Sequence, residues 1–349
     1  MKIALIYGGK SAEHDISILS AFSILQAIYY DYYQVQLIYI TQSGDWLKGP
    51  LLAEAPAEEH QLHIDKNGQG KKITPCEIKE DGIIVFPVLH GPNGEDGTIQ
   101  GLFEILEVPY VGAGVLASAC GMDKIMAKQV FQQVSIPQLP YVPVTKMSWK
   151  LNPEEIYNQC EGSLIYPMFV KPANMGSSVG ISKAADRDEL IAAIKEAFRF
   201  DYRVVVEQGI DAREIEVAVL GNEEIRTTLA GEIVKDVAFY DYESKYIDNQ
   251  VSLQIPAKVS EDVHKKAREY AEKAYAALDG CGLTRCDFFL TSNGELFLNE
   301  VNTMPGFTPY SMYPLLWKQM GLNYGDLLEE LIQLAKLRFE EKQNVRVIK

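Results

Sequence analysis

The stretch TRCDFFLTSNGELFLNEVNTMPG, residues 284–306, decides how the last third of the chain folds. Two apolar runs flank the dipeptide Asn293-Gly294, which is typical of a two-residue type I′ hairpin turn. We therefore expect antiparallel strands at Arg285–Leu290 and Glu295–Asn302. The second strand is unusual, because a carboxylate and an amide interrupt its apolar run just before a Pro-Gly turn.

This hairpin places four polar side chains on one face. A two-residue turn sets Asp287 opposite Glu300 and Arg285 opposite Asn302, and residues two apart in a strand share a face. Two facing carboxylates repel each other unless a positive charge lies between them. Two carboxylates and an amide supply the oxygen ligands that Mg²⁺ prefers. The alternative is a solvated polar face on which Arg285 forms a salt bridge.

The composition is that of a globular protein with several domains. The chain has 349 residues, 47% hydrophobic and 23% charged, and at ~100–200 residues per domain it holds two or three domains. Its formal net charge of −15 argues against a nucleic-acid or anionic-membrane binder. Five scattered cysteines without a C-x-x-C pair indicate reduced thiols. Since we find no signal peptide and no bilayer-spanning apolar run, we expect a cytoplasmic protein.

Strands and helices alternate in the first third of the chain. The apolar runs Lys2–Tyr7, Tyr33–Ile40 and Gly82–Gly91 predict strands. A helical spacing of apolar residues follows Ser11, which can cap the start of that helix. This alternation indicates a doubly wound, parallel-sheet α/β domain, which we end at residue 119.

The remainder divides into two α+β parts, residues 120–207 and 208–349. In the first part we expect a helix at Asp123–Ser135, and the proline-rich IPQLPYVPV after it is typical of a linker. The second part contains a long aromatic loop flanked by strands, then the hairpin. It ends in an amphipathic helix that we expect from about Asp326 to Phe339.

Two lysines suggest phosphate binding. Lys124 opens a helix, where a cation opposes the helix dipole unless an anion is held there with the free backbone N–H groups. Lys171 ends a strand and precedes the Gly/Ser-rich ANMGSSVG, a pattern that resembles a phosphate grip with a lid. Lys124 could instead be a solvated surface residue. The chain has neither a Walker A sequence nor a G-x-G-x-x-G after its first strand, so any nucleotide site uses another fold.

Several motifs together resemble the ATP-grasp carboxylate–amine ligases: Lys124, Lys171 with GSSVG, Glu207, TRCDFFL and LNEVNTMPG. Within that superfamily nearly the whole chain resembles the D-alanine–D-alanine ligase family, through GGKSAEHDIS, HGPNGEDGTIQG, YVGAGVLASACGMDK, FYDYESKY and NEVNTMPGFTPYS. The resemblance implies an N-terminal α/β domain followed by a two-domain ATP-grasp fold. It places ATP between the second and third domains.

The resemblance also implies roles for the polar residues around ATP. The implied ligands of two Mg²⁺ ions, with Mn²⁺ as a possible substitute, are Asp287, Glu300 and Asn302. The implied ATP contacts are Lys124, Lys171 and Lys245 at the phosphates, Glu207 beside the adenine and Glu214 at the ribose.

Further residues are implied to hold the two amino-acid substrates. Glu13 and His90 are implied to hold the first D-alanine, and Ser311 and Met312 the second. Arg285 and the Gly306 N–H are implied to bind the oxyanion that forms during the reaction. Ser177 and Tyr246 are implied to be partners of Glu13 in closing a loop over the site. Plainer explanations stay open, because Glu13 could complement a helix N-terminus, His90 could be a packed histidine and Tyr246 could belong to a packed aromatic loop.

The resemblance implies that ATP activates the carboxylate of one D-alanine as an acyl phosphate, which the amine of a second D-alanine then attacks. It also implies a homodimer. Within the family a Tyr at position 246 accompanies dipeptide formation, whereas a Phe accompanies the use of D-lactate. The alternatives are a D-alanine–D-lactate or other ATP-grasp ligase, and a regulatory protein that only binds ATP.

Overall fold

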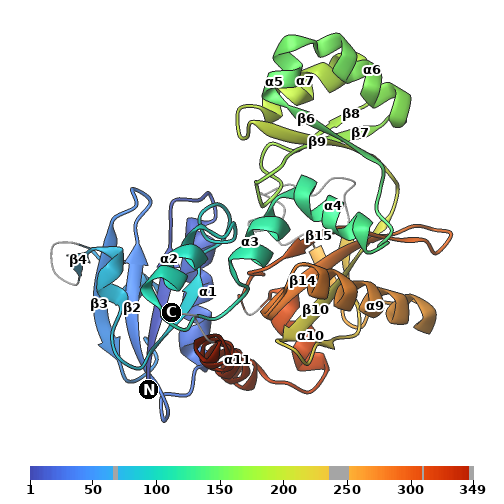
Figure 1. Cartoon of the computed structure of the whole chain (residues 1–349). Coiled ribbons are helices and arrows are strands. Elements are labelled where there is room, and N and C mark those ends of the chain that lie inside the picture. The colour runs from blue at the N-terminus through green and yellow to red at the C-terminus, as the bar shows by residue number, and fades with distance from the viewer. Residues whose placement is uncertain (66–69, 236–250, 309, 346–349) are drawn as a thin grey trace.

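The computed structural model describes residues 1–65, 70–235, 251–308 and 310–345. These residues form three β-sheets, one in each part of the molecule (Figure 1). The first third of the chain lies beside the last third, and the central part, green in the figure, stands above the last third as a separate lobe.

The N-terminal sheet has the strand order β4-β3-β2-β1-β5. Its strands are β1 (Lys2–Gly8), β2 (Gln34–Ile40), β3 (Trp46–Leu52), β4 (Lys71–Ile73) and β5 (Ile83–Val88). Strands β1, β2 and β5 are parallel as expected, whereas β3 and β4 add an antiparallel edge that we did not predict. A short turn between Thr41 and Asp45 reverses the chain after β2, and such a turn can join only antiparallel strands.

The helices of this part are α1 (His14–Ala27) and α2 (Thr98–Leu106), with short 3₁₀ turns at Glu59–Leu62 and Pro75–Ile78. The prediction that Ser11 caps α1 is wrong, because the helix begins at His14 and the Ser11 hydroxyl donates to the His90 carbonyl at 2.7 Å. The Ser17 hydroxyl accepts from the Gly8 N–H at 2.8 Å instead, and this bond ties α1 to the end of β1.

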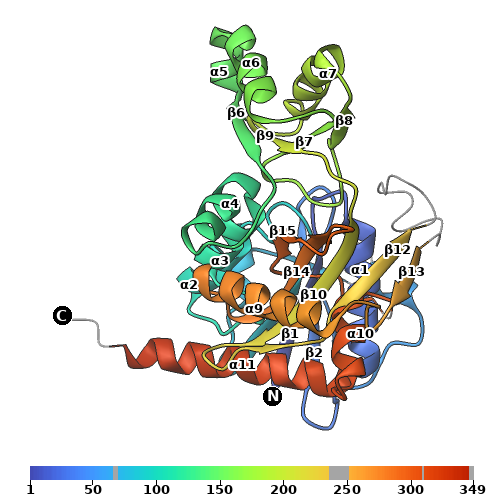
Figure 2. The same cartoon turned by 90° about the vertical axis from the view of Figure 1, so that its right-hand side faces the viewer.

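The last helix, α11 (Tyr324–Asn344), packs against the N-terminal part. Its buried apolar residues join one core cluster with α1 and with Ile3, Leu5 and Tyr7 of β1. The Tyr29 hydroxyl also donates to Asp326 Oδ1 at 2.8 Å. Figure 2 shows α11 running beneath the strands of both the first and the last part. The two ends of the chain therefore share a single core.

The central lobe is an antiparallel sheet with the order β6-β9-β7-β8. Its elements are β6 (Tyr141–Thr145), α5 (Lys146–Leu151), α6 (Pro153–Ser163), β7 (Met168–Pro172), β8 (Ser182–Ala184), α7 (Arg187–Ala197) and β9 (Arg203–Gln208). The proline-rich segment expected as a linker contributes β6. Because β6 lies at the edge of the sheet, Pro143 does not break a central ladder.

The C-terminal sheet has the path β13-β12-β10-β14-β15, with β11 beside β10. Its strands are β10 (Arg213–Gly221), β11 (Arg226–Thr227), β12 (Gly231–Lys235), β13 (Val251–Gln254), β14 (Gly282–Leu290) and β15 (Leu296–Asn302). One face packs under α3 (Val115–Met122), α4 (Lys124–Gln133) and α9 (Glu261–Ala277), while α10 (Met312–Gln319) joins the core formed with α11. Alternation along β14 buries Cys286 and Phe288 on the covered face and turns Arg285 and Asp287 to the other.

All five cysteines are free. Within the part of the chain that the structure describes, no helix combines the length and apolar character needed to cross a membrane.

Candidate active site

The hairpin of β14 and β15 has the predicted register at its polar residues, but it reaches that register by another route. Asp287 pairs with Glu300 and Arg285 with Asn302. The loop is three residues long rather than two, since the Thr291 N–H bonds to the Glu295 carbonyl at 3.0 Å, so the predicted type I′ turn is wrong. A β-bulge restores the register, because Phe288 pairs with Leu298 while its neighbour Asp287 pairs with Glu300.

The residue that the bulge inserts is Asn299, between Leu298 and Glu300. Lys171 donates to its side-chain oxygen at 3.3 Å, from the neighbouring lobe. β-Bulges next to functional sites commonly redirect a side chain in this way. The bulge therefore does two things: it aligns Glu300 with Asp287 and it links β15 to the lysine of β7.

Three carboxylates lie side by side across the face of this sheet that α3, α4 and α9 do not cover. Glu216 of β10 pairs with Asp287 of β14, which in turn pairs with Glu300 of β15. Arg285 lies among them, and its Nε and Nη2 donate to the two oxygens of Asp287 at 2.7 Å each. The amide of Asn302 also donates to Asp287 Oδ2, at 2.9 Å.

Charge around Arg285 compensates for its burial. Burial alone would lower the pKa of Arg285. The carboxylates of Asp287 and Glu216 outweigh burial and hold this pKa well above its ordinary value. The guanidinium is therefore a fixed positive charge beside the two carboxylates that we predicted as metal ligands. Sequence analysis missed Glu216, and the signal that could have found it is its spacing of two from Glu214 on one strand.

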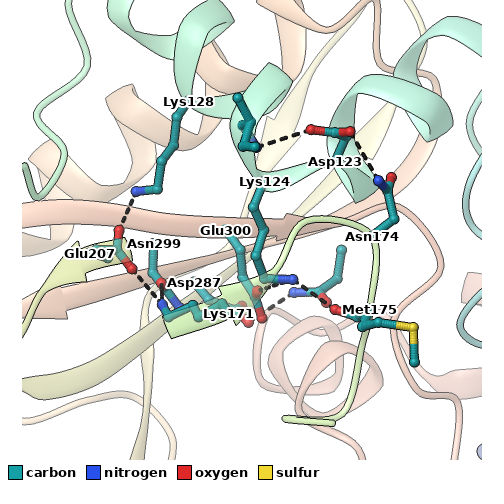
Figure 3. A network of polar contacts seen from close by, with 12 residues as sticks. Asp123, Lys124, Lys128, Lys171, Asn174, Met175, Glu207, Asp287, Asn299 and Glu300 are labelled. Atoms are coloured by element: carbon teal, nitrogen blue, oxygen red, sulfur yellow. Dashed lines mark hydrogen bonds and ion pairs between the residues drawn. The ribbon is translucent and has the colours of Figure 1, made fainter. Parts of the chain in front are cut away.

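A second buried network holds Lys171. Its ammonium lies 2.5 Å from Glu207 Oε2, and the ammonium of Lys128 forms an ion pair with the other oxygen of Glu207 (Figure 3). Lys128 and Glu207 are 3% and 2% exposed, so both charges are removed from water. Burial opposes ionisation of Glu207, but the two ammonium groups outweigh it and lower the pKa of the carboxyl to about 2.

Lys128 did not appear among our candidates, although its spacing from Lys124 places both on one face of α4. The side chain of Lys124 donates to the carbonyl of Met175 at 2.8 Å and lies 3.7 Å from Glu300 Oε2. Lys171 and Lys124 thus approach the carboxylates of the C-terminal sheet from two different elements (Figure 3).

The start of α4 does not offer the free N–H groups that we expected for an anion. The Lys124 N–H donates to the carbonyl of Ala173 at 3.0 Å, and Asp123 accepts from the N–H groups of Ile125 and Met126. The first of these bonds fastens the Gly/Ser-rich loop to the helix, and the other two cap the helix. The predicted phosphate contact at Lys124 would therefore depend on its side chain.

The Gly/Ser-rich loop also touches the N-terminal part. The Ser177 hydroxyl donates to Glu13, which is 164 residues away in the sequence. The Glu13 carboxylate lies against two glycines as well, since a Cβ on Gly91 would come within 2.7 Å of it and one on Gly176 within 3.3 Å. Side chains larger than hydrogen at these two positions would crowd the Glu13–Ser177 contact.

His90 lies just beyond the end of β5 and is buried. Its ring contacts the Ser20 hydroxyl through Nε2, and the carbonyl of Met304 and the carboxylate of Glu95 through Nδ1, at 3.2, 3.2 and 3.5 Å. Burial opposes protonation, but Glu95 raises the pKa of His90 above its ordinary value. His90 thus links the N-terminal sheet to the segment that follows β15.

The remaining predicted residues are more dispersed. Ser311 accepts from the Thr308 N–H at 3.0 Å, and a Cβ on Gly306 would come within 2.9 Å of the Ser311 hydroxyl. Met312 is buried in the core cluster under α10 and α11. Glu214 is on β10, two residues before Glu216. Lys245 and Tyr246 lie outside the described residues.

Lys171 of the small lobe and Lys124 of α4 face carboxylates of the large C-terminal sheet, and this two-lobed architecture is the ATP-grasp fold. Family models described as D-ala D-ala ligase N-terminus and D-ala D-ala ligase C-terminus match residues 2–113 and 130–333. The chain belongs to the D-alanine–D-alanine ligase family, and it is a ligase.

Relatives cover the chain nearly end to end. A D-alanine–D-alanine ligase of Enterococcus hirae is 66% identical and covers 98% of each chain, and one of Macrococcus caseolyticus is 52% identical over 99% of this chain and 98% of its own. Among solved structures, the D-alanine–D-alanine ligase of Coxiella burnetii has a TM-score of 0.84 at 34% identity, covering 99% of this chain and 98% of its own. The VanG D-Ala:D-Ser ligase of Enterococcus faecalis has a TM-score of 0.85 at 35% identity, covering 96% and 99%.

Proposed function

We propose that the protein joins two molecules of D-alanine into D-alanyl-D-alanine, with ATP converted to ADP and phosphate, for peptidoglycan precursor synthesis. The proposal rests on one observation: Asp287 pairs with Glu300 on one face of the C-terminal sheet, and two lysines reach the same strand pair. Lys124 lies near Glu300, and Lys171 donates to Asn299. The names of relatives at 52–66% identity support the choice of substrates.

In the first step, the carboxylate of one D-alanine attacks the γ-phosphate of ATP, giving D-alanyl phosphate and ADP. Catalysis of phosphoryl transfer consists mostly of positioning and charge neutralisation. We assign Lys124, Lys171 and Lys245 to the phosphates, Glu207 to the adenine and Glu214 to the ribose. Lys171 would exchange its bond with Glu207 for a phosphate oxygen as ATP enters.

The oxygen-rich donor set of Asp287, Glu300 and Asn302 fits Mg²⁺. Among the described residues no three carboxylate, imidazole or thiol side chains converge closely enough to hold a metal by themselves. Mg²⁺ commonly takes one or two carboxylates together with substrate phosphates, so this sparse set suits two ions that arrive with ATP, with Mn²⁺ as a substitute. When bound, the metal would neutralise charge on the transferring phosphoryl group.

In the second step, the amine of the other D-alanine attacks the acyl carbon and phosphate leaves. We assign Arg285 and the Gly306 N–H to the oxyanion of the tetrahedral intermediate, where losing one donor typically costs ~10²–10³ in rate. Ser311 and Met312 would border the second amino acid, with Glu13 and His90 beside the first. The Glu13–Ser177 contact closes the Gly/Ser-rich loop over the site and keeps water from the acyl phosphate.

Several further features belong to this proposal. We divide the chain into an N-terminal substrate domain of residues 1–119, a central ATP-grasp subdomain of 120–207 and a C-terminal subdomain of 208–349. We also propose a homodimer that acts in the cytoplasm on small molecules only, in keeping with free cysteines and an acidic net charge.

The test is phosphate release from ATP as a function of D-alanine, with the product identified by mass. We expect release that requires both D-alanine and Mg²⁺, and one dipeptide for each phosphate. A protein that binds ATP without releasing phosphate on addition of D-alanine would contradict the proposal. Parallel reactions containing D-lactate or D-serine as second substrate would reveal a different ligase.

Tyr246 gives a prediction about the second substrate. Tyr246→Phe removes a hydroxyl that we place with Glu13 and Ser177 in the polar network around that substrate. We expect the variant to form more of the ester with D-lactate relative to dipeptide, measured by competition between D-alanine and D-lactate. Unchanged use of D-lactate would refute the role given to Tyr246.

A further inference from the structure

We propose that Glu216 is a positioning residue for Arg285, and that it holds the guanidinium in place when Asp287 turns to a metal ion. The inference rests on the proposed function, because it concerns the oxyanion site of that reaction. It adds a residue outside the set that sequence analysis and the family resemblance assigned.

The pairing of β10 with β14 fixes the position of Glu216 in the site. It lies on β10 directly beside Asp287 of β14, and it is 4% exposed. Its Oε2 lies 3.1 Å from Arg285 Nε. A carboxylate this deeply buried is stable only beside a positive charge, and Arg285 supplies one.

The hydrogen-bond geometry of Arg285 separates the roles of its two carboxylate partners. Nε carries a single hydrogen, and this hydrogen is donated to Asp287 Oδ1 at 2.7 Å. Glu216 therefore contacts the same nitrogen mainly through charge. Asp287 binds the guanidinium at Nε and Nη2, while Glu216 approaches it at Nε.

This arrangement matters because the metal and Arg285 need the same oxygens. If Asp287 directs its oxygens to Mg²⁺, the bidentate bond to Arg285 weakens. Glu216 is close enough to Nε to take that hydrogen bond without moving the strand. The guanidinium then stays on the face of the sheet that carries Asp287 and Glu300, where the acyl carbon would lie.

Among the described residues, Glu216 does not join Asp287 and Glu300 in a three-carboxylate metal site. Although Glu216, Asp287 and Glu300 are neighbours across three strands, no such trio among the described residues converges on a common point for a metal. The contact with Arg285 turns Glu216 to the guanidinium instead. Removing its charge should therefore disturb Arg285 more than the binding of metal and nucleotide.

The chain offers a matched control in the same sheet. Glu232 of β12 is also buried and forms a bidentate pair with Arg213, at 2.7 Å for both bonds. It pairs with Ile215, whose neighbours in the strand face the other way, so it lies on the side opposite to Glu216. Glu232→Gln therefore breaks the same kind of ion pair away from the site.

The experiment compares the full-length protein with E216Q and E232Q in three measurements: dipeptide formation, calorimetric binding of Mg·ADP, and urea unfolding. For E216Q we expect kcat to fall ~10- to 10²-fold, less than the loss of an oxyanion donor itself, with the Kd for Mg·ADP unchanged. E232Q should unfold at lower urea concentration yet keep its kcat. E216D, which retains the charge on a shorter side chain, should recover part of the lost rate.

Each other outcome overturns the inference. If E216Q keeps the wild-type kcat, Glu216 does not position Arg285. If E216Q weakens Mg·ADP binding as much as it lowers kcat, Glu216 acts on the metal or nucleotide. If E216Q and E232Q lose activity in proportion to stability, the role of Glu216 is structural only. A wild-type protein without D-alanine-dependent phosphate release would instead fail the proposed function, and this inference with it.

Discussion

Glu207 illustrates how single residues are held in this site. One carboxylate lies between two buried ammonium groups, Lys128 and Lys171, and the three side chains carry a net charge of +1. Lys171 of this trio also donates to Asn299 of the C-terminal sheet (Figure 3). An anionic nucleotide would therefore meet a local positive charge in a protein whose formal net charge is −15.

The depressed pKa of Glu207 predicts a pH dependence of stability. The folded-state pKa of about 2 lies below the unfolded value of ~4.3, so the ionised carboxylate stabilises the protein above that unfolded value. This contribution is lost as pH falls from about 4.5 towards 2. We expect Glu207→Gln to lower the free energy of unfolding by ~3–5 kcal/mol at pH 7 and to weaken its dependence on pH below 5.

Urea unfolding between pH 7 and pH 3 measures both effects. Glu340→Gln is the control, since it removes the same charge from an exposed position of α11. An E207Q variant whose stability falls with acid as steeply as that of the wild type would show that Glu207 is not the titrating group.

The sequence predicted some residues of the site and not others for a physical reason. Asp287 and Glu300 followed from local rules, namely alternation within strands and a short loop between them. Glu216 did not, because β10 and β14 are separated by 60 residues of chain and no local pattern fixes how they pair. The spacing of Lys128 from Lys124 is local, but its contact with Glu207 of β9 joins segments far apart in the chain. Contacts between distant segments depend on the whole packing.

At the scale of elements, the prediction of the β14–β15 hairpin is confirmed in the register of its polar residues and wrong in the type of its turn. The longer loop shifts the register by one residue and the bulge at Asn299 shifts it back. Both features depend on backbone conformations that a pattern of apolar residues does not encode. Strands β3, β4 and β6 were missed for a related reason, since short or proline-containing strands at or near a sheet edge carry a weak apolar signal.

Gly294 allows a direct test of the loop. Its φ of +83° is in the left-handed region, and a Cβ there would meet no atom within 4 Å, so a substitution changes only the backbone energy. We expect Gly294→Val to lower the free energy of unfolding by ~1–2 kcal/mol and Gly294→Asn by less, because Asn tolerates this conformation. Urea unfolding measures both, and equal losses for the two variants would contradict the explanation.

At the scale of the whole molecule, the first and last parts of the chain depend on each other. The N-terminal core includes α11, whose buried face is provided by Leu327, Leu328, Leu331, Ile332 and Ala335. Arg338 of the same helix donates to the carbonyl of Tyr110 at 2.9 Å, where the chain leaves the N-terminal part. The order of elements along the chain does not reveal this arrangement, because an amphipathic helix does not specify which sheet it covers.

Removal of α11 should therefore unfold more than the C-terminal end. We expect a variant that ends at Asn323 to lose the cooperative unfolding of the N-terminal part and to bind a hydrophobic dye such as ANS. A variant that ends at Gln343 keeps every buried residue of the helix and should behave as the full-length protein does. Retention of cooperative unfolding by the shorter variant would show that the N-terminal part is an independent domain.

The position of α11 also has a consequence for synthesis on the ribosome. Strand β5 completes the parallel strands of the N-terminal sheet at Val88, but the helix that covers part of it begins at Tyr324. Roughly 230 residues separate the end of β5 from the start of α11. At a translation rate of ~5–20 residues per second, α11 is therefore synthesised on the order of 10–50 s after β5. During that interval the nascent chain presents an uncovered apolar surface to the cell, so its need for chaperones should depend on how soon α11 is translated.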